Sequence, residues 1–328
     1  FQTIRTEGAL LPADLLKRIA DGDKTLDGLN PESYHLDASE RINEVTNRAW
    51  TACRDAWQRF QKMRSELPES DKGTTLTRDR WLLKLFQELG YGRLQTARTV
   101  EIDDKSYPVS HAWHAVPIHL ISFRYDLDHA VKDIARVSGH SLVQELLNRD
   151  DSSLWGFVSN GLQLRILRDN VSFTRAAYVE FDLEDMMEGE VYSDFVLLWL
   201  LCHQSRVEPV GSKEAGSKEE GPGAAPSTPS SLLATPCWLE RWHLAAKQQG
   251  TRALDHLRDG VQKAIEVFGQ GFLAHRGNAP LRSKLADGSL TTQQYYQQLL
   301  RLVYRLIFLF VAEDRDLLLL STADARTR

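Results

Sequence analysis

The side chains best suited to chemistry in this chain lie in one short stretch. Asp103-Asp104-Lys105 places two carboxylates beside an ammonium group, and three histidines follow at His111, His114 and His119. Carboxylate oxygens bind hard cations such as Mg²⁺, and a positioned base beside such a metal supports hydrolysis of a phosphodiester. These residues would form a metal-dependent hydrolytic site only if the fold brought them together.

Both clusters also have a simpler interpretation. Asp103-Asp104-Lys105 is typical of a polar turn between two strands. Alternation along a strand would direct the three histidines to different faces, and no paired Cys, Asp or Glu completes a set of ligands. We therefore predict no catalytic, cofactor-binding or metal-binding residue in this chain.

The elements that would position these residues are predicted from the spacing of apolar side chains. The first part of the chain is predicted to contain two helices, then a three-stranded meander, then a short helix, over 39–63, 78–89, 97–102, 106–111, 116–123 and 142–147. Asn160-Gly161 next predicts a β-hairpin, because both central residues of a type I′ turn need positive φ. Further strands are expected over 154–159, 162–167 and 178–181, with a buried helix over 195–202.

A change in composition divides the chain. Residues 210–231 contain almost no large apolar side chain and are rich in Gly, Pro, Ser and charge, which is typical of a flexible linker. The predicted organisation is an N-terminal helical segment (1–76), an α/β domain (77–209), the linker (210–231) and an α-helical connector (232–328). The fold class is therefore α+β (mixed α/β), with an all-α region at the end.

The last predicted helix, which includes residues 304–315, is apolar on almost every side, so we expect it to be buried in a bundle. Arg301, Arg305 and the charged triplet after them interrupt it too early for a membrane span. Part of its surface is expected to pack on a helix over 254–268 that begins near Thr251. Phe268-Gly-Gln-Gly-Phe272 is predicted to form the C-cap of that helix.

Charge and cysteine content limit the possible partners. The formal net charge of −5 gives no overall attraction to nucleic acid, so any DNA contact must come from a local patch. Weak candidates for such contacts are Gln144, Arg165, Arg168 and Arg175. The three cysteines have no CxxC spacing, which favours a reducing cytoplasm over a disulfide framework or a zinc site. The chain starts with neither a signal peptide nor an initiator Met, and we expect both ends to be cut ends.

The predicted order of elements over 78–159 resembles the PD-(D/E)xK nuclease core, in which an Asp on the second strand and an E-x-K on the third hold a metal. Here Ser110 or His111 stands where the Asp is expected, and 116–122 contains neither a carboxylate nor a lysine. Gln144 stands where several restriction nucleases keep a glutamine on the second helix. The resemblance implies a degenerate nuclease-like fold without nuclease activity.

Four segments together resemble a larger protein class, namely 142–148, 154–168, 177–183 and 300–315. In this order they are similar to the N-terminal region of large adenine-specific DNA methyltransferases of type II restriction-modification and of phage-defence systems such as BREX and DISARM. The resemblance implies that a methyltransferase domain begins after Arg328 and uses S-adenosylmethionine to methylate N6 of a flipped adenine. It implies double-stranded DNA and defence-system proteins as partners, and no membrane.

The leading hypothesis is thus the N-terminal, non-catalytic part of an adenine-N6 DNA methyltransferase, which braces the enzyme or binds DNA or partners. One alternative is an active Mg²⁺-dependent DNA endonuclease that uses Asp103, Asp104 and Lys105. Another is a non-enzymatic module that recruits other defence proteins.

Overall fold

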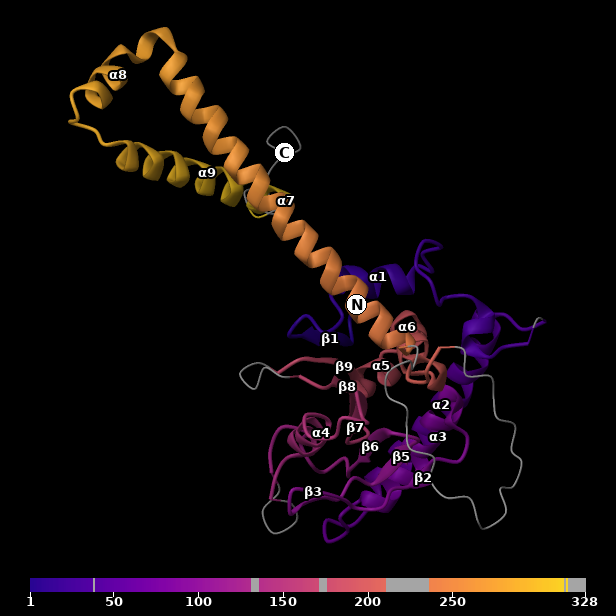
Figure 1. Ribbon diagram of the computed structural model, residues 1–328. Coiled ribbons are helices and arrows are strands. Elements are labelled where there is room, and N and C mark those ends of the chain that lie inside the picture. The colour runs from indigo at the N-terminus through magenta and orange to yellow at the C-terminus, as the bar shows by residue number, and fades with distance from the viewer. Residues whose placement is uncertain (38, 131–135, 171–175, 211–235, 316, 318–328) are drawn as a thin grey trace. The chain divides into compact units, whose positions relative to one another are not determined.

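The computed structural model describes residues 1–37, 39–130, 136–170, 176–210, 236–315 and 317. The chain forms two compact units, 1–246 and 247–328, and its architecture is mixed α+β (Figure 1). Most of the predicted linker, residues 211–231, lies outside the described residues. No helix in the described part of the chain is long and apolar enough to cross a membrane.

The first unit is built around one mixed sheet. Its strands follow the order β1-β9-β8-β7-β6-β5-β2, in which β6 and β7 are parallel and every other neighbouring pair is antiparallel. The bounds are β1 (Ile4–Glu7), β2 (Gln95–Thr96), β5 (His111–Trp113), β6 (Val116–Leu120), β7 (Trp155–Ser159), β8 (Gln163–Arg168) and β9 (Tyr178–Asp182). The first strand along the chain, β1, therefore pairs with the last strand along the chain, β9.

The predicted meander exists, but with different strands. In the sheet it consists of β2, β5 and β6, and the chain leaves the sheet between β2 and β5 to form a separate hairpin of β3 (Val100–Ile102) and β4 (Lys105–Tyr107). Asp103 and Asp104 connect β3 and β4 with φ of 50° and 60°. Two positive φ values in a two-residue loop close a tight hairpin, so the prediction of a polar turn here is confirmed.

Helices cover both faces of the sheet (Figure 1). On one face, α2 (Ile42–Ser65), the π-helical turns η2 (Leu76–Leu82) and η3 (Gln87–Tyr91) with α3 (Leu83–Phe86) between them, and α6 (Tyr192–Cys202) form the larger core cluster. On the other face, α4 (Gly139–Leu147) packs with the β3–β4 hairpin. Successive residues of β7 point to opposite faces of the sheet. Phe157 belongs to the larger core cluster and Val158 belongs to the smaller one. The helices expected over 39–63, 78–89, 142–147 and 195–202 are confirmed.

Shorter helical elements complete this unit. They are α1 (Ala13–Ala20), α5 (Leu183–Glu188) and the 3₁₀ turns η1 (Pro31–Tyr34) and η4 (Gln204–Arg206). The first turns of α7 (Trp238–Ala274) also belong to it, and Leu239 and Trp242 are buried in its core.

The Asn160-Gly161 hairpin is confirmed, although its turn type differs from the expected type I′. Ser159 pairs with Leu164, so the loop has four residues, and only Gly161 takes positive φ, at 86°. Asn160 instead accepts hydrogen bonds through Oδ1 from the amides of Leu162 and Gln163, at 3.0 and 2.8 Å. The loop is therefore closed by hydrogen bonds to the Asn160 side chain, and a second residue with positive φ is not needed.

The second unit contains the rest of α7, then η5 (Arg276–Asn278), α8 (Ala279–Ala286) and α9 (Thr292–Asp314). The prediction of a C-cap at Gly269 is wrong, because the helix continues through it to Ala274. A Cβ on Gly269 would lie 3.1 Å from Leu299 Cδ1, and its carbonyl accepts a 2.9 Å hydrogen bond from the Tyr295 hydroxyl. The glycine therefore marks close helix packing.

The terminal helix α9 is only partly buried. Leu299, Val303 and Ala312 are buried, whereas Tyr304 and Phe308 are 61% and 71% exposed. The expectation that this helix is buried in a bundle is wrong. It contacts the preceding long helix at Gly269, whereas Leu254 and Leu257, which the prediction included in that contact, are exposed. The long helix begins at Trp238, and the predicted start near Thr251 is wrong because the amphipathic stripe alone did not mark the earlier turns.

Candidate functional site

A pocket of about 660 Å³ opens where α4 connects the parallel strands β6 and β7. Its walls are the end of β6, the first turn of α4, the β3–β4 hairpin and the π-helical turn η2. The lining residues are Thr74, Arg78, Asp104, Lys105, Ser106, Pro108, His119, Ile121, Ser122, Tyr125, Asp126, His129, Arg136, Val137, Gly139 and Leu142. In α/β sheets, ligands bind beyond the carboxyl ends of parallel strands, and this pocket occupies such a position.

Arg78 is the most unusual group in the pocket. It lies in the π-helical turn η2 and is half-buried, and its Nε donates a 2.7 Å hydrogen bond to the carbonyl of Leu120 at the end of β6. It forms no ion pair with any residue in the described ranges. Burial lowers the pKa of this guanidinium, although the nearby Asp79 opposes the effect. A half-buried cation without a carboxylate partner is ready to bind an anion.

His119 supplies a neutral imidazole to the same pocket. Burial lowers its pKa to about 4, and the charges of Arg78 and His111 add to the effect. Its Nδ1 accepts a 3.3 Å hydrogen bond from the amide of Ser110, so at neutral pH the proton is on Nε2. His119 is therefore a hydrogen-bond donor through Nε2 under ordinary conditions.

Neither of the other two histidines lines the pocket, although Ser110 contacts the rings of both His111 and His119. His111 is buried at the start of β5 beside Ser110 Oγ, at 2.9 Å, and burial lowers its pKa to about 4. His114 is exposed in the turn between β5 and β6, with φ of 51°. Among the residues that the structure describes, no group of three His, Cys, Asp or Glu side chains is placed to hold a metal ion.

The acidic residues on the pocket wall are only partly available. Asp126 accepts hydrogen bonds from the amides of Asp128 and His129, at 2.6 and 3.2 Å, and from the His129 ring. Lys105 is paired with Glu145, which lies outside the pocket. Asp104 lines the pocket from the exposed turn of the hairpin. The wall thus carries three cationic side chains, of Arg78, Lys105 and Arg136, against two carboxylates.

The residues predicted to contact nucleic acid lie elsewhere. Arg165 is buried, and it donates to Glu180 through Nε, at 2.6 Å, and to Asp128 through both Nη atoms, at 2.5 and 2.8 Å. Arg168 donates to Glu240 at 2.8 and 2.9 Å. Gln144 donates to the carbonyl of Arg168 and to Asn148, at 3.0 and 2.9 Å.

These contacts fasten β8 to its neighbours, and contact of Arg165 or Arg168 with phosphate would require breaking an ion pair. Arg175 lies outside the described residues. The assignment of these residues to nucleic acid stays a prediction. Arg78 was not identified from the sequence, because an arginine near the start of an amphipathic helix is usually solvated. His119 could be noticed in the sequence because it is a histidine within an otherwise apolar strand.

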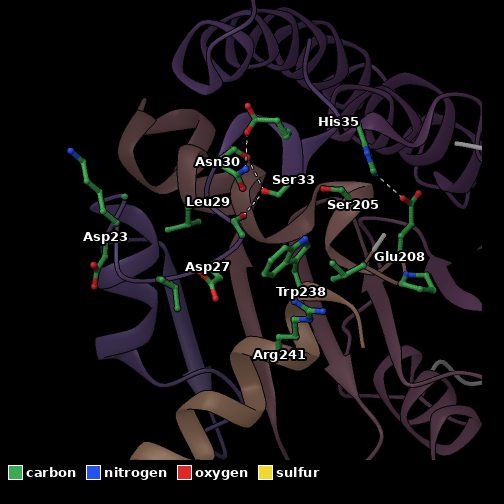
Figure 2. Close-up of a pocket in the computed structure, with 17 residues that line it drawn as sticks. Asp23, Asp27, Leu29, Asn30, Ser33, His35, Ser205, Glu208, Trp238 and Arg241 are labelled. Atoms are coloured by element: carbon green, nitrogen blue, oxygen red, sulfur yellow. Dashed lines mark hydrogen bonds and ion pairs between the residues drawn. The ribbon is translucent and has the colours of Figure 1, made fainter. Parts of the chain in front are cut away.

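A second cavity, of about 980 Å³, lies between the segment after α1, the segment after η4 and the first turn of α7 (Figure 2). Figure 2 shows His35 facing Glu208, and their side chains are 3.0 Å apart. The guanidinium of Arg241 lies over the Trp238 ring, 4.9 Å from its centroid. Charges of both signs are interleaved along this wall, so it does not indicate one class of ligand.

Three residues that line this second cavity, Gly28, Ser33 and Trp238, also contact Arg206, which is fully buried. It donates to the carbonyls of Gly28, at 2.6 Å, and Ser33, and it lies 3.7 Å from the centroid of the Tyr34 ring. The rings of Trp238 and Trp242 are within 5.6 and 5.4 Å. Carbonyl groups and aromatic faces hold this arginine. Because they come from both the N-terminal segment and the start of α7, the contacts of Arg206 join these two parts of the chain.

Comparison of the chain with protein-family models, with curated proteins and with solved structures finds no match. The pocket at the β6–α4–β7 crossover remains the strongest guide to function. It combines an unpaired half-buried guanidinium, a neutral imidazole donor and the N-terminus of a helix. Each of these groups favours an anionic ligand.

Proposed function

We propose that this chain is the N-terminal part of an S-adenosylmethionine-dependent adenine-N6 DNA methyltransferase of a restriction-modification or phage-defence system. In this proposal the first unit is a degenerate PD-(D/E)xK-like domain that does not cleave DNA, and the helices of the second unit connect it to a catalytic domain. Its work is to brace that domain and to help hold double-stranded DNA or partner defence proteins in the cytoplasm.

The observation that supports this proposal best is the connection of β2, β5 and β6 through α4 to β7. An antiparallel meander followed by a helix and a parallel strand is the order expected of the nuclease core. The pocket lies at the end of the third strand of that core, where His119 is found and β6 has no carboxylate. Metal-dependent hydrolysis needs hard oxygen ligands, which supports a binding role over a cleaving one.

The methyltransferase part of the proposal is tested with the full-length gene product. Expression of the uninterrupted reading frame and incubation with labelled S-adenosylmethionine and unmethylated plasmid should transfer label to adenine N6. The reading frame after Arg328 should encode a Gly-x-Gly loop after a strand and an Asn-Pro-Pro-aromatic motif. A stop codon or an unrelated domain in that position, or no methyl transfer, would reject this assignment.

The competing endonuclease function has one structural observation in its favour, since Asp104 and Lys105 both line the pocket. Incubation of the chain with supercoiled plasmid and Mg²⁺ or Mn²⁺ should leave the plasmid intact if the proposal is correct. Metal-dependent nicking that disappears in Asp104→Ala and persists in Asp103→Ala would establish the nuclease instead. Asp103 is a matched control because it belongs to the same turn but does not line the pocket.

A purely protein-recruiting module is separated from a DNA-bracing one by salt dependence. Binding of duplex DNA that weakens with rising salt concentration supports the proposal, because phosphate contacts release counterions. Absence of binding at low salt would favour recruitment of proteins alone.

A further inference from the structure

We propose that the pocket at the β6–α4–β7 crossover binds a single nucleoside monophosphate unit, with the phosphate at Arg78, Arg136 and His119 and the base against the apolar wall. This inference deepens the proposed function and rests on it only in expecting that the nucleotide comes from nucleic acid. The ligand chemistry itself is argued from the pocket.

The phosphate end is defined by cations that the protein leaves without partners. Arg78 is held by one hydrogen bond from Nε to the Leu120 carbonyl, and neither it nor Arg136 forms an ion pair within the described ranges. A guanidinium anchored through Nε keeps its two Nη groups for a planar, two-point contact with phosphate oxygens. The rigid strand end at Leu120 therefore fixes the donor before a ligand arrives.

His119 and α4 add neutral and dipolar donors at the same end. The Nε2–H of His119 is available because Nδ1 accepts from the Ser110 amide. The nine-residue helix α4 begins at Gly139 on the pocket wall, with its N-cap hydrogen bond from the Ser141 amide to Ser138 Oγ at 3.1 Å. A helix N-terminus carries partial positive charge, which reinforces the two guanidinium groups without competing for their donors.

The rest of the pocket suits a base. Pro108, Ile121, Val137 and Leu142 supply an apolar wall, and Tyr125 adds an aromatic side chain to it. A volume of about 660 Å³ is within the usual range for sites that enclose one small molecule. A base paired inside a duplex cannot enter such a pocket, so the nucleotide must be free or must be an unpaired unit of a strand.

The carboxylates limit the charge that the pocket accepts. Lys105 is paired with Glu145, so Arg78 and Arg136 are opposed by Asp104 and Asp126. This balance of charge accommodates one phosphate better than the larger negative charge of a triphosphate. The Asp126 carboxylate is already occupied by two amides and His129, so it does not compete for Arg78. We therefore expect a monophosphate to bind more tightly than the corresponding triphosphate.

The direct test is calorimetric titration of the chain with dAMP, and with dATP and adenosine as comparisons. We expect dAMP to bind with a Kd below about 1 mM and adenosine to bind at least about tenfold more weakly, because it lacks the phosphate contacts. The His119 ring protons should shift on addition of dAMP in NMR spectra. Equal binding of adenosine and dAMP, or no binding of dAMP, would contradict the proposal.

Variants locate the binding to this pocket. Arg78→Gln and the exposed Arg136→Gln should each weaken dAMP binding by about tenfold, whereas Arg98→Gln, an exposed arginine outside the pocket, should leave it unchanged. Arg136→Gln keeps the test valid if Arg78→Gln fails to fold. Unchanged binding in the folded pocket variants would overturn the assignment.

The source of the nucleotide is resolved with single-stranded oligonucleotides that carry either a 5′-phosphate or a 5′-hydroxyl. Preference for the 5′-phosphate identifies a strand end as the ligand, whereas binding of dAMP alone identifies a free nucleotide, and both support the pocket assignment. Methyl transfer by the full-length protein is measured separately. A methyltransferase that fails to bind dAMP would remove only this inference, and dAMP binding without methyl transfer would remove only the proposed function.

Discussion

Arg165 illustrates how a single residue in this chain can be assigned two different roles. In the sequence it is one of several arginines near a hairpin, which suggests contact with phosphate. In the structure its side chain is buried between Glu180 and Asp128, and it lies 4.4 Å from the centroid of the Tyr178 ring. Burial and pairing depend on residues far away in the sequence, so local spacing could not distinguish the two roles.

The ion pair of Arg165 with Glu180 should be a strong determinant of stability. Arg165→Met leaves the Glu180 carboxylate buried without its partner, which typically costs about 3–5 kcal/mol. Chemical denaturation should show this loss in the free energy of unfolding. The matched control is Arg48→Met, which removes an exposed, solvent-screened pair with Glu40 and should leave the free energy of unfolding almost unchanged. Lost DNA binding without lost stability would instead support the phosphate role.

His140 should make stability depend on pH. Its Nδ1 accepts from the Arg165 guanidinium at 3.2 Å, and burial followed by the charge of Arg165 lowers its pKa to about 4 from a usual 6.5. The folded state therefore binds fewer protons than the unfolded state between these values. The stabilisation is complete above about pH 6.5, falls as the pH decreases, and is fully lost near pH 4.

Replacement of His140 by Gln keeps an acceptor for Arg165 but removes the titrating group. Between pH 4.5 and 6 the free energy of unfolding should then rise less steeply with pH. The slope should decrease by about 1.4 kcal/mol per pH unit, which is the effect of one proton. His111, His119 and His203 also have lowered pKa values, because burial disfavours their charged forms. The variant should thus retain part of the pH dependence, and an unchanged slope would exclude His140 as a contributor.

At the scale of elements, regular periodicity of apolar residues predicted the long helices and strands well, whereas the short irregular elements could not be predicted in this way. The helices α2, α4 and α6 and the strands β7, β8 and β9 follow patterns of apolar residues that continue for a full element. The strands β2 to β5 have only two or three residues each, which is too short for a period to be recognised. The sequence therefore placed strands 97–102 and 106–111 in the meander, where the structure has the β3–β4 hairpin.

The pocket depends on those irregular pieces, which explains why it could not be assembled from the sequence. Its walls combine the turn at Asp104, the π-helical turn at Arg78 and the first turn of α4. Only the crossover from β6 through α4 to β7 was expected from the order of elements. Asp104, Lys105 and His119 were singled out in the sequence and do line the pocket, whereas Arg78 and Arg136 were not expected there.

Packing of α9 on the long helix in the second unit depends on Gly269. Gly269→Leu would place a large side chain where even a Cβ lies 3.1 Å from Leu299, and overpacking of this kind costs about 1–3 kcal/mol. Gly271→Ala is the control, because its Cβ would meet nothing within 4 Å, and the loss of backbone freedom should stabilise the helix by about 0.5–1 kcal/mol. Thermal unfolding followed by circular dichroism should show opposite shifts for the two variants. Shifts in the same direction would mean that Gly269 is not a packing position.

At the scale of the whole molecule, the two units differ in how much apolar surface they bury. Both core clusters consist only of residues up to Ala246, including Leu239 and Trp242 from the start of α7. The second unit has few buried side chains, and Leu254, Leu257, Tyr304 and Phe308 are all exposed. The folding of the first unit should thus not require the second.

A fragment of residues 1–246 should therefore fold by itself and unfold cooperatively at nearly the temperature of the first unit in the whole chain. A fragment of residues 1–236 is the matched control, because it lacks Trp238 and Trp242, whose rings cover the buried guanidinium of Arg206. Loss of a buried Trp side chain costs about 3–5 kcal/mol, so the shorter fragment should unfold at a much lower temperature. Near-ultraviolet circular dichroism and thermal unfolding measure both fragments. If 1–246 were as unstable as 1–236, the boundary after Ala246 would not separate independently folding units, and the residues after it would have to contribute to the stability of the sheet.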